Sequence, residues 1–143
     1  MTICFFVPGR PVPKGRPRVT RYGTYTPKST VEFESRVSTV WRLKSGECFP
    51  PKVPLQAVVA VHFEIPKSES KKRKAAMVGT PHVSRGDLDN VVKAVLDALN
   101  GKAFPDDAAI CKIIAEKDYQ PEPGVEILIT EKELSQNEFK DME

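Results

Sequence analysis

An alternating run of apolar residues in the middle of the chain most constrains the fold. Every second residue of the segment 55–65 is apolar, in the series Leu55, Ala57, Val59, Val61, Phe63 and Ile65. Because side chains of a strand alternate between the two faces of a sheet, this pattern predicts a long, largely buried strand. His62 falls on the more polar face, where a hydrogen-bonded structural role is favoured over metal ligation.

Two other segments have the spacing of helices. The apolar residues of the first recur three and four positions apart, in the series Leu88, Val91, Val92, Val95, Leu96 and Leu99. With Asn100-Gly101 as a stop signal, this spacing predicts a helix over about 88–99. Upstream, Ser29 and Glu32 form a capping box ahead of an apolar stretch, which predicts a helix over about 30–44.

The remaining segments complete an α+β domain. Apolar stretches predict further strands at 3–7, 110–117 and 125–130. Between these elements lie a Pro/Gly-rich basic arm or loop at 8–28, a basic loop at 66–86 and an acidic tail at 131–143. The order is strand, helix, strand, helix, strand, strand. This order predicts one domain over 1–143, with a small mixed sheet and two main helices packed on it.

Composition narrows the class of protein. A chain of 143 residues with 40% hydrophobic and 29% charged residues is typical of a soluble globular domain, and no apolar stretch is long enough to span a membrane. No export signal is visible at the N-terminus. The three cysteines, Cys4, Cys48 and Cys111, are far apart and odd in number, so we expect reduced thiols in a cytoplasmic protein.

Charge is unevenly distributed along the chain. The first 31 residues contain no acidic residue but six basic ones: Arg10, Lys14, Arg16, Arg18, Arg21 and Lys28. A second basic run, Lys71-Lys72-Arg73-Lys74, lies in the middle. Any one of these runs alone is as compatible with a solvated loop as with a binding site. Set beside an acidic cluster, they are typical of an enzyme that cleaves a polyanion, since lysine and arginine neutralise backbone phosphates.

Such an acidic cluster begins where the basic loop enters the second predicted helix. Asp87 and Asp89 lie two residues apart beside Asn90, and Asp89, Lys93 and Asp97 follow one another at intervals of four. In a helix these last three side chains share one face. Taken alone, the pattern is also compatible with a solvent-facing, salt-bridged helix that has Asp87 as its N-cap.

A second pair of carboxylates, Asp106-Asp107, follows just after the end of the same helix. Acidic residues are unfavourable near a helix C-terminus, and two acidic clusters brought together repel each other unless a cation lies between them. Oxygen ligands of this kind suit Mg²⁺ or Mn²⁺, which activate water for phosphodiester hydrolysis. We therefore predict a divalent-metal site in which Lys93 either neutralises charge on the reacting phosphate or holds the strand that is cut.

Two motifs in this chain resemble a known family. The stretch 85–101, RGDLDNVVKAVLDALNG, followed by Phe104-Pro105-Asp106-Asp107, resembles the core of RusA-type Holliday junction resolvases. The opening 8–18, PGRPVPKGRPR, is similar to the start of their phage and prophage branch. Gly86 departs from the pattern, because many relatives carry proline before the first aspartate; the expected effect is a freer loop with no ligand lost.

The resemblance implies an α+β, homodimeric, Mg²⁺-dependent endonuclease that nicks two opposing strands of a four-way DNA junction, in recombination and repair. It implies that Asp87, Asp89 and Asp107 are metal-binding catalytic carboxylates and that Lys93 is the essential lysine. Asp106 is a further metal-ligand candidate, and Asp97 and Asn90 are candidate supporting residues. The expected phosphate contacts are Arg10, Lys14, Arg16, Arg18, Arg21, Lys71, Lys72, Arg73, Lys74 and Arg85. The alternatives are a DNA-structure-binding protein that does not cut, and another metal-dependent nuclease.

Overall fold

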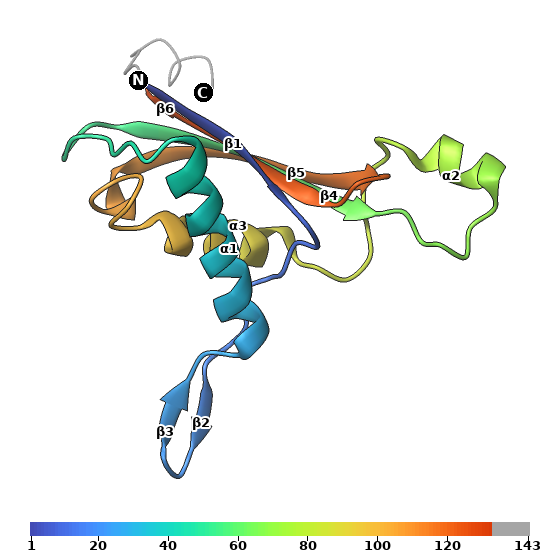
Figure 1. Ribbon diagram of the computed structural model, residues 1–143, viewed down its shortest axis with the longest axis horizontal. Helices are drawn as coiled ribbons and strands as arrows, with labels where there is room; N and C mark the ends of the chain where they lie inside the picture. Colours follow the sequence, from blue (N-terminus) through green and yellow to red (C-terminus); the bar gives the residue numbers. More distant parts are fainter. Residues whose placement is uncertain (133–143) are drawn as a thin grey trace, which may run out of the picture.

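A mixed four-stranded sheet carries two long helices on one face in the computed structural model, which describes residues 1–132 (Figure 1). The element types agree with the predicted α+β class. Apart from its first two residues, the predicted acidic tail at 131–143 lies outside the described residues.

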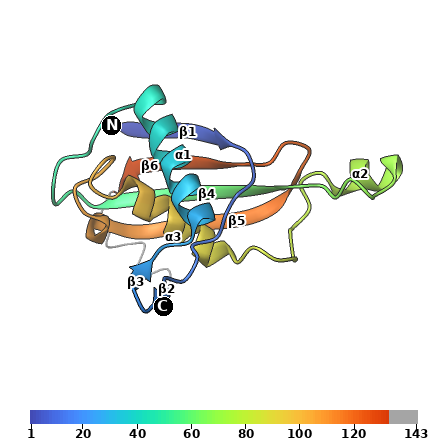
Figure 2. The ribbon, with the colours of Figure 1, turned by 60° about the horizontal axis from the view of Figure 1, so that its bottom comes forward.

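The strands of this sheet are β1 (Thr2–Pro8), β4 (Leu55–Glu64), β5 (Ile110–Gln120) and β6 (Gly124–Glu131), in the spatial order β1-β6-β4-β5 that Figure 2 shows. β4 and β5 are parallel, whereas β6 pairs antiparallel with both β1 and β4. β5 runs three residues beyond its predicted end, because Asp118 and Tyr119 continue the pairing with His62 and Phe63. The prediction of a mixed sheet is confirmed.

The core lies between the sheet and the helices α1 (Lys28–Lys44) and α3 (Leu88–Leu99), which cross on the same face of the sheet (Figure 2). α3 has the predicted bounds. One face of β4 packs against these helices, and its residues there are fully or almost fully buried: Leu55, Ala57, Val59 and Val61. The alternation in the sequence therefore identified the core-facing side of this strand correctly.

The start of α1 differs from the prediction. The helix begins at Lys28, after Pro27 as N-cap, and no side chain caps it. Ser29 lies inside the first turn. Glu32 forms an ion pair with Lys28 (Nζ–Oε1 3.7 Å), one turn earlier. The predicted capping box is therefore wrong, because proline supplies a backbone angle suited to the helix start and the two residues of the box lie too far into the helix.

The basic segment after β1 contains a hairpin that the sequence analysis did not predict. β2 (Arg18–Thr20) and β3 (Gly23–Tyr25) pair antiparallel around a turn at Arg21 and Tyr22. Every residue of the two strands is exposed, and the hairpin projects away from the sheet beyond the first turn of α1 (Figure 1). Without a buried face, the hairpin left no apolar alternation to detect.

The predicted loop 66–86 contains a short helix, α2 (Lys71–Met77), which projects from one end of the sheet (Figure 1). Ser70 caps this helix by accepting a hydrogen bond from the Arg73 backbone N–H (3.2 Å). Lysine, arginine and alanine favour helix, but no residue of α2 is buried, so the segment lacks the apolar stripe on which the prediction relied. The interpretation of 66–86 as a continuous loop is therefore wrong.

After α2 the chain returns along the outer edge of β5. The backbone N–H of Gly79 donates to the carbonyl of Tyr119 (2.8 Å), and the N–H of Tyr119 donates to the carbonyl of Thr80 (2.9 Å). The backbone N–H of His82 donates to the carbonyl of Lys117 (3.2 Å). These bonds cover part of an otherwise unpaired strand edge. They also fix the path of the chain toward Asp87.

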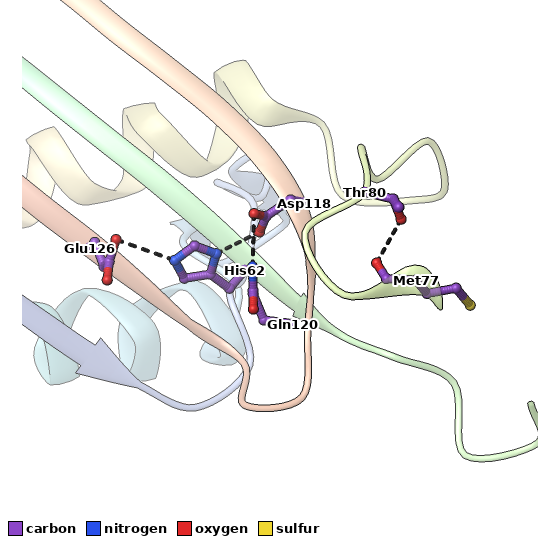
Figure 3. A network of polar contacts seen from close by, with 6 residues as sticks. All are labelled: His62, Met77, Thr80, Asp118, Gln120 and Glu126. Atoms are coloured by element: carbon purple, nitrogen blue, oxygen red, sulfur yellow. Dashed lines mark hydrogen bonds and ion pairs between the residues drawn. The ribbon is translucent and has the colours of Figure 1, made fainter. Parts of the chain in front are cut away.

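The face of the sheet opposite the helices carries a polar network around His62 (Figure 3). Its Nδ1 lies 2.5 Å from the carboxylate of Asp118, and its Nε2 lies 3.4 Å from that of Glu126. Burial alone would lower the pKa of His62, but the hydrogen bonds and charges of these two carboxylates outweigh burial and raise it above 6.5. The predicted structural role of His62 agrees with this network.

The same view shows Thr80 donating to the carbonyl of Met77 (2.7 Å), which closes the turn after α2 (Figure 3). All three cysteines are free and exposed. None of the helices within residues 1–132 combines the length and hydrophobicity that crossing a membrane requires.

Candidate active site

A cavity of about 920 Å³ between α3 and β5 brings the predicted acidic residues together. Its lining includes the side chains of four aspartates and two lysines: Asp87, Asp89, Asp97, Asp107, Lys93 and Lys117. Apolar residues of both elements, among them Leu96 and Ile113, form the remaining wall. Asp106 and Asn90, which were also predicted for the site, do not line the cavity. The structure thus joins residues separated by 30 positions in one concave surface.

Asp87 and Asp89 reach the cavity from the start of α3. Asp87 occupies the N-cap position, but its side chain makes no capping hydrogen bond. Its backbone carbonyl accepts the N–H groups of Asn90 and Val91 instead (3.1 Å each). A purely structural N-cap would use its carboxylate to satisfy these first amides. Here the carboxylate is left to face the cavity.

Asp107 returns to the cavity through a tight turn after α3. The side-chain carbonyl of Asn100 accepts a hydrogen bond from the backbone N–H of Asp107 (2.9 Å). The backbone N–H of Gly101 donates to the carbonyl of Phe104 (2.8 Å). Phe104 is fully buried, so it fixes this turn to the core. The sequence predicted Asn100 only as a helix stop. No pattern in the sequence indicates that its side chain also places Asp107.

Asp106 acts on the backbone and on its neighbour. Its carboxylate accepts a hydrogen bond from the backbone N–H of Ala108 (3.0 Å). In this way Asp106 caps the short 3-10 helix Asp107–Ala109. The pKa of Asp107 is raised by burial, then by its hydrogen bond with Asp106 and by the negative charges of Asp106 and Asp97. The cavity therefore gathers negative charge at Asp107, which a bound cation would offset.

Asp97 is paired with a lysine from the N-terminal arm. The Nζ of Lys14 lies 3.2 Å from an Asp97 carboxylate oxygen and also forms an ion pair with Glu34 of α1. The backbone N–H of Lys14 donates to the carbonyl of Asn90 (2.8 Å). Burial alone would lower the pKa of Lys14, but the hydrogen bonds and charges of Glu34 and Asp97 outweigh it and raise that pKa. Lys14 therefore ties the arm to both long helices at the edge of the cavity.

The two lysines of the cavity have different surroundings. Lys93 is exposed, lies one turn after Asp89, and has no ion-pair partner within residues 1–132. Lys117 donates from Nζ to the backbone carbonyls of Ser84 and Gly86, both at 3.1 Å. It therefore holds the segment that leads directly into Asp87. The sequence analysis missed Lys117, because a lysine in a predicted strand carries no distinguishing signal.

Gly86 occupies a position that only glycine fits. Its φ is +112°, and a Cβ there would lie 2.6 Å from Cζ of Phe63. Proline, whose φ is fixed near −65°, is incompatible with this conformation. The expectation that Gly86 leaves the loop freer does not hold, because the residue is packed closely against a ring and its carbonyl is held by Lys117.

The carboxylate oxygens of the cavity are ligands of the type that a hard divalent cation prefers. Carboxylate oxygens are the protein ligands that Mg²⁺ and Mn²⁺ prefer, and Mg²⁺ keeps several waters and so needs only one or two carboxylates. Within residues 1–132, however, no three side chains of the ligating types are already arranged around one point. The aspartates that would hold the ion are Asp87, Asp89 and Asp107, whose exposed side chains are free of capping bonds.

The other predicted DNA-contacting residues lie at both ends of the molecule. Arg16, Arg18 and Arg21 belong to the arm and the hairpin, and Lys71, Lys72, Arg73 and Lys74 belong to α2. All of these are exposed except the half-buried Lys74. Arg73 forms an exposed ion pair with Glu69 (3.0 Å). Arg10 and Arg85 line a separate small cavity.

Comparison with known proteins places the chain in a family. Residues 8–130 match the family described as Endodeoxyribonuclease RusA. The chain is also 35% identical over 137 residues to a Bacillus subtilis (strain 168) protein that is described as "Uncharacterized protein YqaN", with 90% of this chain and 96% of that protein covered. Since the family match spans most of the chain, including every residue that lines the acidic cavity, this protein belongs to the RusA family of endodeoxyribonucleases.

Proposed function

We propose that the protein is a Mg²⁺-dependent, structure-selective endodeoxyribonuclease that resolves four-way DNA junctions by paired symmetric nicks, with Mn²⁺ able to replace Mg²⁺. The observation that carries this proposal is the cavity that four aspartates share with Lys93 and Lys117. A protein that only binds DNA gains nothing from a concentration of carboxylates facing phosphate. Membership of an endodeoxyribonuclease family supports hydrolysis of DNA as the reaction.

In this proposal, Asp87, Asp89 and Asp107 hold the metal ion, and Asp106 fixes the turn that presents Asp107. When bound, the ion supplies an activated water and charge stabilisation for phosphodiester hydrolysis. Lys93, which has no partner within residues 1–132, is placed to neutralise charge on the phosphate in the transition state. Lys117 keeps the backbone before Asp87 in position.

Replacing one carboxylate tests this assignment. We expect Asp89→Asn to abolish cleavage of a synthetic four-way junction and to leave the affinity for the junction intact. The substitution removes one proposed metal ligand and preserves the fold. Glu47→Gln, at an exposed carboxylate in the loop after α1 and outside both the cavity and the open face of the sheet, is the matched control and should cut normally. Full cleavage by Asp89→Asn with Mg²⁺ present would overturn the assignment. Absence of cleavage by the wild type would favour the DNA-binding alternative.

We also propose that the protein acts as a homodimer, because a twofold protein presents two sites to a pseudo-symmetric junction. The open face of the sheet supports this proposal. It has an apolar hollow of about 400 Å³ whose lining includes Phe6, Val58 and Leu128, with no cover within residues 1–132. Lys112 and Glu116 add both signs of charge to the same face, so two copies can meet without an excess of like charge.

The mass of the protein in solution tests the dimer. Ile114 is 45% exposed on the open face, so its replacement does not disturb the core. We expect light scattering to give a dimer for the wild type and a monomer for Ile114→Lys. Val83→Lys, at an exposed apolar residue outside that face, is the control and should remain dimeric. A monomeric wild type, or a dimer unaffected by Ile114→Lys, would contradict the proposed interface.

A further inference from the structure

A second cavity lies next to the acidic one and has a different lining. It measures about 320 Å³, and its wall includes three aromatic rings, two arginines and one glutamate: Phe63, His82, Tyr119, Arg10, Arg85 and Glu64. We call this set the aromatic pocket. The proposed hydrolysis does not use any of these residues. Arg10 and Arg85 are exposed and have no ion-pair partner within residues 1–132.

The rings are held in fixed positions. Phe63 and His82 are stacked, with ring centroids 4.0 Å apart and planes inclined by 18°, and His82 lies 4.7 Å from the ring of Tyr119. The backbone N–H and carbonyl of Tyr119 are both hydrogen-bonded to the segment after α2. These bonds hold in place the part of β5 that bears the ring. Such preorganised rings lose little freedom when a planar ligand stacks on them.

His82 has features of a binding residue. It is only 7% exposed, and its Nδ1 is buried with no hydrogen-bond partner within residues 1–132. Burial and the positive charge of Lys117 both lower its pKa, which favours the neutral form of the ring. A neutral imidazole stacked on Phe63 offers an apolar surface rather than a charge. A buried polar atom without a partner is costly in a purely structural role.

The lining favours a nucleobase over a phosphate. Aromatic rings stack on every base, because each base has a π-face. Glu64 would repel a phosphate but can accept a hydrogen bond from an amino group or a ring N–H of a base. The arginines at the same pocket suit the backbone phosphates on either side of such a base.

The pocket also has the right place relative to the acidic cavity. Arg85 precedes Asp87 by two residues, and Lys117 links the two cavities: it lines the acidic one, and its Nζ lies 5.9 Å from the ring centroid of Phe63. A nucleotide whose base entered the aromatic pocket would thus have its backbone near the carboxylates.

We propose that the aromatic pocket binds one unpaired nucleobase of a DNA strand and so positions the neighbouring phosphate in the acidic cavity. This inference rests on the proposed function, because it assumes DNA as the substrate. It goes beyond that function in assigning a base-binding subsite to residues outside the carboxylate cluster. Base pairing would hide the face and edge that the pocket contacts, so an unpaired base is required.

Binding of single strands without divalent cations tests the subsite separately from cleavage. The probes are a fluorescent oligothymidylate and an abasic oligonucleotide of equal length, measured by anisotropy. We expect the wild type to prefer the strand with bases by roughly five- to hundredfold, the range for stacking of a base on an aromatic residue. Tyr119→Ala should lose at least about fivefold of this preference, and Tyr119→Phe, which keeps the ring, should retain it. Gln120→Ala, whose side chain faces the other side of β5, is the control and should bind as the wild type does.

A crosslinking measurement on the wild type covers the case in which Tyr119→Ala fails to fold. An oligonucleotide with 5-iodouracil, irradiated in complex with the protein, should attach to a peptide that contains Phe63, His82 or Tyr119. Equal affinity for strands with and without bases, or crosslinks confined to the hairpin, would overturn the subsite. Neither result depends on cleavage, so a failure here is distinct from a failure of the proposed nuclease.

Discussion

The Nζ of Lys14 lies 3.2 Å from the carboxylate of Asp97 and forms a second ion pair with Glu34. This lysine was predicted from its basic segment as a phosphate contact. In the structure its charge is balanced by two carboxylates of the same chain. Its place at the edge of the acidic cavity suggests a different role, in which Lys14 holds the N-terminal arm and sets the charge around Asp97.

The two kinds of basic residue should respond differently to salt. Replacing Lys71, Lys72 and Arg73 of α2 by glutamine should flatten the dependence of log Kobs on log salt, by roughly one unit for each charge that contacts a phosphate. Lys14→Gln should leave this slope unchanged, because the half-buried Lys14 ammonium group is paired with two carboxylates, whereas the Arg73 side chain in its pair with Glu69 is exposed. The measurement is junction binding over a series of salt concentrations. An unchanged slope for the α2 variant would sink the role of α2 in DNA binding.

Lys117 should matter for turnover more than for binding. Lys117→Met removes both hydrogen bonds that hold the segment before Asp87. The resulting displacement of Asp87, a proposed metal ligand, should slow single-turnover cleavage about ten- to hundredfold. Junction affinity should change little. Lys44→Met, at an exposed lysine in the last turn of α1 and outside both the cavity and the open face of the sheet, serves as the control. Equal losses in affinity and rate would show that Lys117 contacts DNA instead.

Gly86 should be intolerant of a side chain. Gly86→Ala places a methyl group against Phe63 at a φ of +112°, well outside the left-handed helical region, whereas Gly101→Ala has a φ of +75°, close to that region, with no atom within 4 Å. The difference between the two variants therefore reports the contact with Phe63 together with the greater backbone strain at Gly86. We expect Gly86→Ala to lower the free energy of unfolding by about 1–3 kcal/mol more than Gly101→Ala does. Equal values in urea titrations would contradict the close packing of Gly86 on Phe63.

The His62 network predicts a pH dependence of stability. The pKa of His62 is raised in the folded state, so its protonation favours folding. The stabilisation is fully present below the unfolded pKa, near 6.5, and is lost as the pH rises through the folded value. The difference in unfolding free energy between the wild type and His62→Gln should therefore shrink as the pH rises above about 6.5. A difference that stays constant or grows with pH would refute the network.

The parts of the fold that bury apolar residues could be predicted from the sequence. The alternation at 55–65 and the helical stripe ending at Leu99 both identify core-facing sides, because periodicity records burial. The hairpin at Arg18–Tyr25 and the helix α2 bury nothing and left no such record. The predicted start of α1 was two residues too late, because Ser29 and Glu32 match the pattern of a capping box. In the structure the helix begins at Lys28, directly after Pro27, without a side-chain cap.

The acidic cavity could be predicted in part for a similar reason. Asp89, Lys93 and Asp97 are neighbours on one helix, so their spacing shows that they share a face. The contribution of Lys117 could not be predicted, because it depends on the pairing of β5 with the segment after α2, a contact between distant parts of the chain. The same is true of the aromatic pocket, whose rings come from β4, β5 and the loop before α3.

The most direct test of the account is incubation of the wild type with a synthetic four-way junction and with a linear duplex of the same sequence, each with and without Mg²⁺. The cut positions on every strand are then read at single-nucleotide resolution. We expect paired nicks at symmetric positions in two opposing strands of the junction, only with Mg²⁺, and an intact duplex. Cleavage that is independent of Mg²⁺, or that is equal on the duplex and the junction, would contradict this expectation.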